Sequence, residues 1–380
     1  MDTDAKILDI IKKLHFMNAS TDDLTVAWHN WLTTSHDPDD FKVMTSVDEF
    51  KQRLISCIPT AGDKDNIYLM LYKNYDMFVK VLNMFDQYRY TSMNSSNAPV
   101  NKCMSNMRLN GMYKVENLYN ENDLTELMSF CDVVERHIGD DISTGGKLQL
   151  SVNSLGQITG MHNDKSMPTH GELRCQSKSL GCHPPGVEKL AKNLLVGEVC
   201  KTWLNSDKGE IWRSTLSWLS PACKTHIGWH IDSIYDVIKV MVLLTDVEYN
   251  NGPMYFIRGS HRLKDDEVTR YKHKIFKWSP TEEIAPRLPE DKIINDPDPM
   301  TIDSDTPVKF YDDELPKLVA TGKRGDAIFF ETNALHSGNR ALSLRKTVIL
   351  STPTKDTTFK NIFLEYIGYP RKRSEIPIGC

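Results

Sequence analysis

The chain has 380 residues, of which 40% are hydrophobic and 26% charged, so it can bury a large core in one to three domains. The net charge of −5 argues against a nucleic-acid-binding protein, and no apolar run is long enough to cross a bilayer. The eight cysteines show no paired spacing and the N-terminus lacks a signal-type apolar region, which together predict a cytoplasmic protein with reduced thiols.

Residues 1–100 predict a helical N-terminal region. Apolar side chains recur at helical spacing within 7–14, and 65–90 predicts one long helix. The Ser/Asn-rich stretch 92–100 favours a linker. We interpret the region first as a packing buttress for the domain that follows. A dimerisation surface and a cap over the substrate remain open, and the oligomeric state is not predicted.

The triplet His162-Asn163-Asp164 places a histidine and a carboxylate two residues apart. In a strand this spacing puts both side chains on one face, where they can bind a metal. The surrounding sequence is polar and broken, however, and no strand is predicted after it. We therefore expect His162 and Asp164 to lie outside any metal site.

The same spacing recurs at His230 and Asp232, and here a buried strand is predicted to follow, at 237–247. A further short buried strand at 327–330 precedes His336. Two histidines and one carboxylate on one face form the ligand set of non-heme iron(II) oxygenases, which leaves coordination positions open. The sequence therefore predicts a metal site made by His230, Asp232 and His336.

The residues after this pair predict a hairpin. Asn250-Asn251-Gly252 favours a tight turn because Asn-Gly readily adopts positive φ. This turn is predicted to join the strand 237–247 to a second strand at 254–257, which Gly259-Ser260-His261 closes. We expect a structural role for His261 rather than metal ligation.

Residues 262–320 predict a long irregular insertion. The segment begins with charged residues, contains seven prolines and accumulates acids towards its end. A long irregular insertion within a compact domain is usually functional or disordered. We interpret 262–320 as a candidate lid over the substrate, with a solvated outer loop as the alternative.

A strand predicted at 342–350 contains Arg345 among apolar residues. An unpaired buried charge is costly, so this arginine needs an anionic partner, and its planar fork suits a carboxylate. Thr347 lies two residues further on and shares its face. We predict that Arg345 and Thr347 bind the distal carboxylate of 2-oxoglutarate, with Arg340 as the weaker candidate.

Several of these segments together resemble a known family. The run TDVEYNNGPMYFIRGSHR, the WHID before it and GDAIFFETNALHSGNRALSLRK after it are similar to the phytanoyl-CoA dioxygenase-like branch of the iron(II)/2-oxoglutarate oxygenases. The resemblance spans about 105–370 and includes a strand and first helix within 113–127. Two departures are the short interval between His336 and Arg345 and the length of the 262–320 insertion.

The resemblance implies an α+β fold, a double-stranded β-helix (a jelly-roll, cupin-like barrel) with flanking helices and an N-terminal helical region. It implies Fe(II) and 2-oxoglutarate as cofactors, with ascorbate as reductant in vitro, and dioxygen and a small-molecule substrate as partners. The expected domains are the helical region 1–100 and the oxygenase domain 105–370.

The resemblance also implies the reaction, which is oxidation of an unactivated C–H bond of a small metabolite, as in natural-product biosynthesis. Hydroxylation is the default outcome, while desaturation and oxidative cyclisation remain open, and Asp232 disfavours a halogenase. Lys239, Arg258 and Tyr255 are candidates to meet an anionic substrate, with surface or core roles equally open.

The alternatives are an acyl-CoA hydroxylase of the same family, a non-catalytic cupin-like binding protein, and a zinc hydrolase. The last two have no need of an arginine in the strand after the final ligand, so Arg345 argues against both.

Overall fold

The computed structural model separates the chain into two compact units, one made of residues 1–91 and 354–380, the other of 92–353. Each unit is described by itself. The residues that the structure describes are 82–83, 86, 89–90, 93, 95–138, 147–152, 158–164, 172–177, 183–207, 209–211, 213–221, 231–249, 251–262, 308–310, 313–315, 317–338, 341–353 and 357–366.

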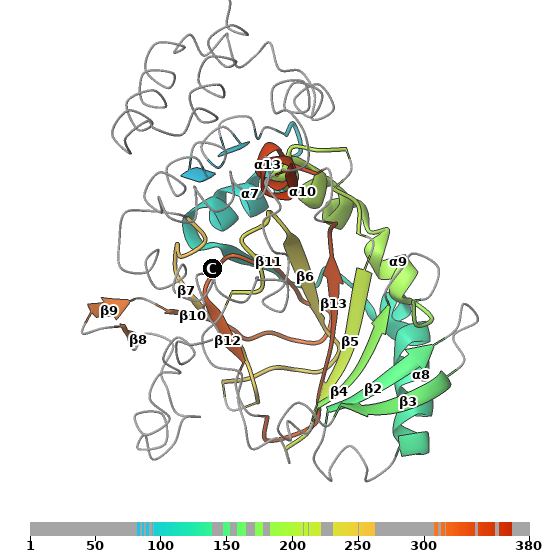
Figure 1. Ribbon diagram of the computed structural model, residues 1–380. Coiled ribbons are helices and arrows are strands. Elements are labelled where there is room, and N and C mark those ends of the chain that lie inside the picture. The colour runs from blue at the N-terminus through green and yellow to red at the C-terminus, as the bar shows by residue number, and fades with distance from the viewer. Residues whose placement is uncertain are drawn as a thin grey trace, which may run out of the picture. The chain divides into compact units, whose positions relative to one another are not determined.

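The unit 92–353 contains helices and strands in mixed order (Figure 1). Its helices are α7 (Ala98–Asn110), α8 (Glu121–Ile138), α9 (Val187–Ala191) and α10 (Leu194–Leu204). Its strands are β1 (Met112–Val115), β2 (Lys147–Val152), β3 (Ile158–Asp164), β4 (Glu172–Ser177), β5 (Arg213–Leu219), β6 (Ile238–Leu243), β7 (Met254–Ile257), β8 (Val308–Phe310), β9 (Asp313–Leu315), β10 (Lys317–Ala320), β11 (Ala327–Glu331), β12 (His336–Gly338) and β13 (Arg345–Ser351).

The strands form two main sheets. The larger has the order β1-β11-β6-β13-β5-β4-β2-β3, and its neighbours are antiparallel except for the parallel pair β2 and β4. The smaller is antiparallel, with the order β10-β7-β12, and β8 pairs with β9 separately. The predicted mixture of helices with antiparallel sheets is confirmed.

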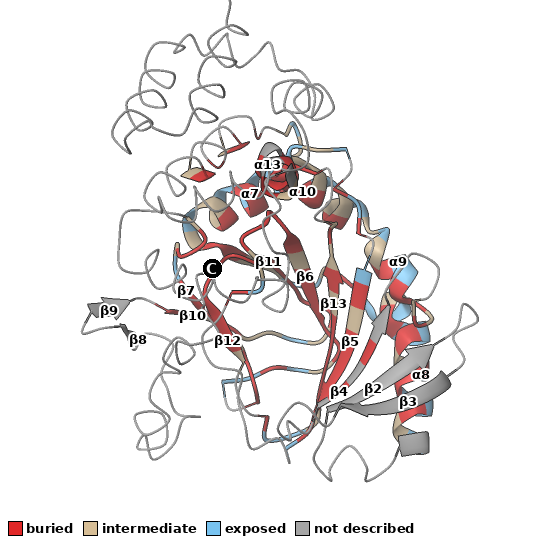
Figure 2. Cartoon of the chain, in the orientation of Figure 1, coloured by how far each residue is buried: buried red, intermediate tan, exposed pale blue. Residues whose placement is uncertain are grey.

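The hydrophobic core lies between the two main sheets. Met241 and Leu243 of β6 and Phe330 of β11 cluster with Phe256 of β7, and the rings of Phe256 and Phe330 meet edge to face with centroids 5.2 Å apart. Figure 2 shows β6, β11 and β13 buried along most of their lengths. The inner faces of the two sheets therefore pack against each other.

The other face of the larger sheet meets helix α8. Glu135 of this helix accepts a hydrogen bond from Trp218 Nε1 at 2.9 Å and pairs with Lys346 Nζ at 2.9 Å. Trp218 and Lys346 are register partners on β5 and β13, so both strands turn this face towards the helix. Because side chains alternate along a strand, Arg345 and Thr347 lie on the inner face.

Helix α7 ends at Gly111, which has a φ of 82°. A Cβ at this position would approach His261 Nδ1 to 2.8 Å, so both the backbone conformation and the close packing require glycine. His261 is fully buried, and its ring centroid lies 6.3 Å from that of Trp203. His261 is thus a core residue that packs against the C-terminal end of α7.

The predicted Gly-Asp turn lies directly before β11 and contacts the segment after β1. Gly325 has a φ of 94°, and Asp326 is buried directly after it. Asp326 Oδ1 accepts a hydrogen bond from the Asn117 backbone N–H at 2.8 Å, and Oδ2 accepts one from the Lys323 N–H at 2.9 Å. The carboxylate therefore fixes the turn before β11 to the segment after β1.

Asp326→Ala is expected to lower the free energy of unfolding by about 1–3 kcal/mol, because two partly buried backbone N–H groups lose a charged acceptor. Chemical denaturation followed by circular dichroism measures this loss. Glu188→Ala is the control, since that carboxylate forms only an exposed pair with Lys192 and should leave stability unchanged within error. Equal stability of Asp326→Ala and the unchanged chain would contradict the assigned role.

The predicted hairpin between β6 and β7 is wrong, because the two strands belong to different sheets. Both edges of β6 are already occupied by β11 and β13, so the chain leaves the sheet after Leu243. Gly252 does have positive φ, at 70°. The chain between β6 and β7 crosses from the larger to the smaller sheet. In this crossing the Asn251 side chain accepts a hydrogen bond from the Ser343 N–H at 3.0 Å, which connects it to the segment before β13.

Three other expectations also need correction. The predicted linker 92–100 runs into helix α7, which starts at Ala98 with a proline in its first turn. His162 and Asp164 lie in a strand, β3, rather than in a broken segment. The insertion 262–320 ends in β10, which pairs with β7 and so belongs to the smaller sheet.

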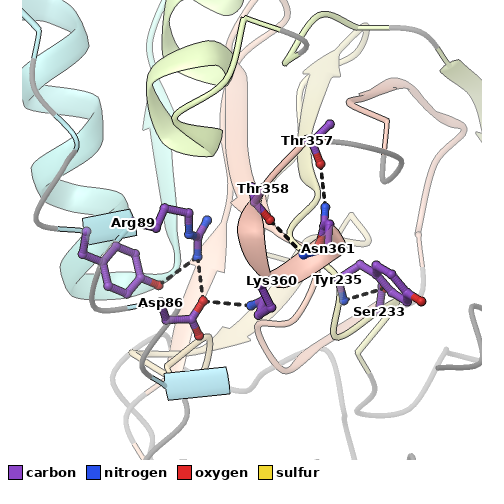
Figure 3. Close-up of polar contacts among 9 residues, drawn as sticks. Asp86, Arg89, Ser233, Tyr235, Thr357, Thr358, Lys360 and Asn361 are labelled. Carbon is purple, nitrogen blue, oxygen red and sulfur yellow. Dashed lines mark hydrogen bonds and ion pairs between the residues drawn. The ribbon is translucent and has the colours of Figure 1, made fainter. Parts of the chain in front are cut away.

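In the unit made of 1–91 and 354–380, helix α13 (Phe359–Tyr366) contributes Lys360 to a buried ionic cluster (Figure 3). Asp86 Oδ1 contacts Lys360 Nζ at 2.8 Å and Arg89 Nη2 at 3.3 Å. The contact of Asp86 with Lys360 connects the two segments of this unit, 1–91 and 354–380. Most of the long helix predicted at 65–90 lies outside the described residues.

Four cysteines are described, and all four are buried free thiols, Cys103, Cys131, Cys175 and Cys200. Burial raises the pKa of Cys103, Cys131 and Cys175 to about 12, so these thiols are protonated and unreactive at neutral pH. None of the helices in the described part of the chain is long and apolar enough to span a membrane.

Candidate metal centre

Two of the three predicted ligands, Asp232 and His336, lie together. Asp232 Oδ2 is 3.3 Å from His336 Nε2. The Asp232 backbone N–H donates to the Thr332 carbonyl oxygen at 2.9 Å, which fixes the segment before β6 beside the end of β11. His336 opens β12, where it pairs in register with Phe256. Residues about a hundred positions apart in sequence are thus brought into contact by the two sheets.

The orientation of the His336 ring is set by its surroundings. Its Nδ1 lies 2.8 Å from the Ala334 carbonyl oxygen, which can only accept, so Nδ1 carries the proton. The ring also packs between Phe256 and Phe330, with both centroid distances 5.7 Å. This contact sets the ring orientation with Nε2 directed at Asp232, the arrangement by which proteins orient metal-binding histidines.

Ser260 anchors the chain immediately before His336. Its Oγ accepts a hydrogen bond from the Leu335 N–H at 2.8 Å and donates to the Ile257 carbonyl oxygen at 2.7 Å. The Gly-Ser-His segment after β7 therefore holds the ligand segment in place. Nothing in the local sequence indicated this role, since Ser260 and Leu335 are far apart along the chain.

The third predicted ligand, His230, lies outside the described residues. Within the described part of the chain no group of three potential ligands occurs, so the complete triad stays a prediction. His162 and Asp164 cannot complete this site. Their strand β3 is five strands away from β6 in the larger sheet, which is roughly 24 Å at the usual strand spacing.

The two described donors fit iron(II). A carboxylate oxygen and an imidazole nitrogen, here 3.3 Å apart, are both ligand types that iron(II) takes. His336 is almost fully buried, whereas the Asp232 side chain is 30% exposed, so the pair has one dry and one open side. Such a site can hold a metal while leaving positions accessible from outside.

A lysine ammonium group lies beside the exposed Asp232 side chain. Lys239 Nζ lies 2.7 Å from Asp232 Oδ2, the same oxygen that faces His336. Of the three residues considered from sequence as partners of an anionic substrate, Lys239 alone contacts a predicted ligand within the described structure. Arg258 donates to Asn110 Oδ1 at 3.0 Å, and the Tyr255 ring packs against a lysine of the smaller sheet.

Arg345 and Thr347, the predicted cosubstrate anchors, are both buried on β13. Ile349 continues their face and packs against the core between the sheets. The Arg345 guanidinium donates from Nη1 to the Gly252 carbonyl oxygen, in the crossing between β6 and β7. Both side chains therefore have the inward orientation that the prediction requires, while their role in binding 2-oxoglutarate is untested. Arg340 lies outside the described residues.

Two cavities of about 630 and 980 Å³ open elsewhere on the described surface. The first lies beside the Gly-Asp turn and the second beside α9, and neither is lined by Asp232, His336 or Arg345. The candidate metal centre is therefore identified by the geometry of its donors and not by a cavity.

Comparison with known proteins identifies the class of the chain. A family model described as Phytanoyl-CoA dioxygenase (PhyH) matches residues 107–346, a range that includes the predicted ligands His230, Asp232 and His336 and the predicted anchor Arg345, and ends just before Thr347. The protein is therefore an enzyme of the dioxygenase class. It belongs to the phytanoyl-CoA dioxygenase family. No curated protein matches the sequence.

Solved structures that match the chain have low sequence identity to it. EctD from S. alaskensis with bound Fe is 15% identical, with 70% of this chain and 81% of that chain covered and a TM-score of 0.41. AviO1 from Streptomyces viridochromogenes Tue57 is 12% identical, with 69% and 98% covered and a TM-score of 0.41. The non-heme alpha-ketoglutarate-dependent epimerase SnoN from nogalamycin biosynthesis is 12% identical, with 67% and 82% covered and a TM-score of 0.40.

Proposed function

We propose that the protein is an iron(II)- and 2-oxoglutarate-dependent oxygenase that oxidises an unactivated C–H bond of a small metabolite, with His230, Asp232 and His336 as the iron ligands. The observation that carries the proposal is the pairing of Asp232 Oδ2 with Nε2 of His336 at 3.3 Å, in a chain of a dioxygenase family. Two metal-binding side chains brought together from segments about a hundred positions apart support a metal site at this place.

In this proposal the two sheets are the two halves of a double-stranded β-helix. The core between β6, β11 and β7 supports this assignment, as does the position of both described donors where the sheets meet. The covered face of the larger sheet, packed on α8, is then the outside of the barrel. The domain boundaries 1–100 and 105–370 stay a prediction, as does the lid role of 262–320, most of which lies outside the described residues.

The residues of the chain would position the reactants. Arg345 and Thr347 are proposed to hold the distal carboxylate of 2-oxoglutarate inside the barrel, where little water competes for the guanidinium. Iron(II), when bound, would supply the activation of dioxygen that is coupled to decarboxylation of the cosubstrate. The aromatic rings of Phe256 and Phe330 shield His336 from solvent and so keep its ring fixed during turnover.

Hydroxylation is the proposed outcome, and desaturation or oxidative cyclisation remains the alternative within the same chemistry. Those outcomes differ only in how the substrate is held after C–H cleavage. An acyl-CoA substrate is the second candidate, since it is named in the description of the family.

Anaerobic titration of the iron(II)-loaded protein with 2-oxoglutarate tests the proposal. The expected result is a visible charge-transfer absorbance, followed by formation of succinate when air and ascorbate are admitted. A chelator should abolish both signals and iron(II) should restore them. Metal binding without any absorbance change or succinate would overturn the proposal in favour of a zinc hydrolase or a non-catalytic binding protein.

A further inference from the structure

The proposed function leaves Lys239 without an assigned role. Its ammonium lies 2.7 Å from Asp232 Oδ2, and its side chain is 23% exposed. Lys239 alternates with Met241 and Leu243 along β6, so it belongs to the inner face of the larger sheet. A charged side chain on this face, beside a predicted ligand, is at the centre of the site and not on the outer surface.

Lys239 and Arg345 lie at opposite ends of this face. Lys239 is the register partner of Ser351 at the end of β13, whereas Arg345 begins that strand. Arg345 and Ser351 are six residue steps apart, which corresponds to about 20 Å along the strand, more than the two side chains can span together. The distal carboxylate of 2-oxoglutarate therefore cannot pair with both, and Lys239 serves the open side where the substrate arrives.

The charge balance around Lys239 changes when a metal binds. Asp232 is the one carboxylate that pairs with Lys239 in the described part of the chain, through the same oxygen that faces His336. A metal that takes this oxygen neutralises its charge and displaces the ammonium from it. The half-buried ammonium then needs a new anionic partner, because an uncompensated charge in such a position is costly.

We propose that Lys239 binds an oxyanion of the primary substrate, a carboxylate or a phosphate, close to the carbon that is oxidised. This inference rests on the proposed function, since it requires the metal and 2-oxoglutarate to occupy their sites. It assigns an anionic substrate class to the enzyme. Neither Arg258 nor Tyr255 can take this role, because their contacts lie away from the two ligands.

The test uses the full-length protein loaded with zinc(II) and 2-oxoglutarate, which cannot turn over. Its probes are metabolite-sized acids with their primary amides, and phosphate monoesters with their alcohols, measured by ligand-observed NMR. Acids or phosphates are expected to bind at least about tenfold more tightly than their neutral partners. Lys239→Met should remove this preference and Lys239→Arg should retain it, with the two probe series distinguishing carboxylate from phosphate.

Lys201→Met is the matched control. Lys201 of α10 forms an exposed pair with Glu210, so its replacement should leave the preference for anionic probes intact. Equal binding of acids and amides, or a preference that survives in Lys239→Met, would overturn the inference. The charge-transfer absorbance of the iron(II)–2-oxoglutarate complex, recorded for the same variants, separates the two failures. If the unchanged protein shows the absorbance, a negative binding result overturns only the role of Lys239. If the unchanged protein lacks the absorbance, the proposed function is overturned as well.

Discussion

His336→Ala is expected to lower iron(II) affinity by more than about a hundredfold and to abolish succinate formation from 2-oxoglutarate. Loss of a residue that merely orients a ligand already costs ten- to a hundredfold in affinity, and His336 is itself a proposed ligand. Calorimetric titration with iron(II) under nitrogen measures the affinity. Because the ring packs between Phe256 and Phe330, thermal unfolding should accompany the titration to show that the variant is folded.

Asp232→Asn gives an independent test that does not disturb the core. The Asp232 side chain is 30% exposed, so the amide fits without repacking, yet the negative charge is lost. The same loss of iron affinity is expected. His162→Ala is the control and should bind iron normally, because β3 lies at the far edge of the larger sheet. Normal iron binding in His336→Ala together with loss in His162→Ala would refute the proposed site.

Local sequence patterns predicted most of the strands that surround the site. The strands expected at 254–257 and 327–330 correspond to β7 and β11, and the strand and helix expected within 113–127 correspond to β1 and the start of α8. Each of these segments has a clear apolar run bounded by turn residues, and burial in the core then fixes its conformation.

The choice of strand partners could not be read in the same way. The turn at Asn251 and Gly252 has the composition of a hairpin, but β6 is already paired on both edges by strands from the end of the chain. Partner choice depends on contacts between residues a hundred positions apart, which leave no periodic signal. The prediction of a turn at Asn251 and Gly252 was therefore right, whereas the prediction that this turn joins two paired strands was wrong.

The same limit applies to the residues that support the site. Ser260 holds the segment before His336, and Glu135 fixes the outer face of β13 through Lys346. Lys239 is only seven residues from Asp232, and their contact depends on how the segment between them packs on Thr332. The ligand pattern was visible because His230 and Asp232 lie two residues apart in the sequence, whereas the contacts that support the site arise only from the packing of the sheets.

Arg345→Gln is expected to weaken 2-oxoglutarate binding by about tenfold or more and to leave iron(II) affinity nearly unchanged. The substitution keeps a polar side chain of similar shape but removes the positive charge, and charge-assisted hydrogen bonds contribute roughly 1.5–3 kcal/mol each. Anaerobic titration of the iron-loaded variant with 2-oxoglutarate, followed by the charge-transfer absorbance, gives the affinity directly.

Two further variants make this result specific. Arg213→Gln changes an exposed arginine at the other end of the β5–β13 pair and should have no effect on the titration. Arg340→Gln tests the weaker sequence candidate and is expected to have a much smaller effect than Arg345→Gln. Because Arg345 also donates to the Gly252 carbonyl oxygen, thermal unfolding must show that Arg345→Gln keeps the crossing between β6 and β7 intact. An unchanged affinity in a folded Arg345→Gln variant would remove the proposed cosubstrate anchor, and a large loss in Arg340→Gln would move it to that residue.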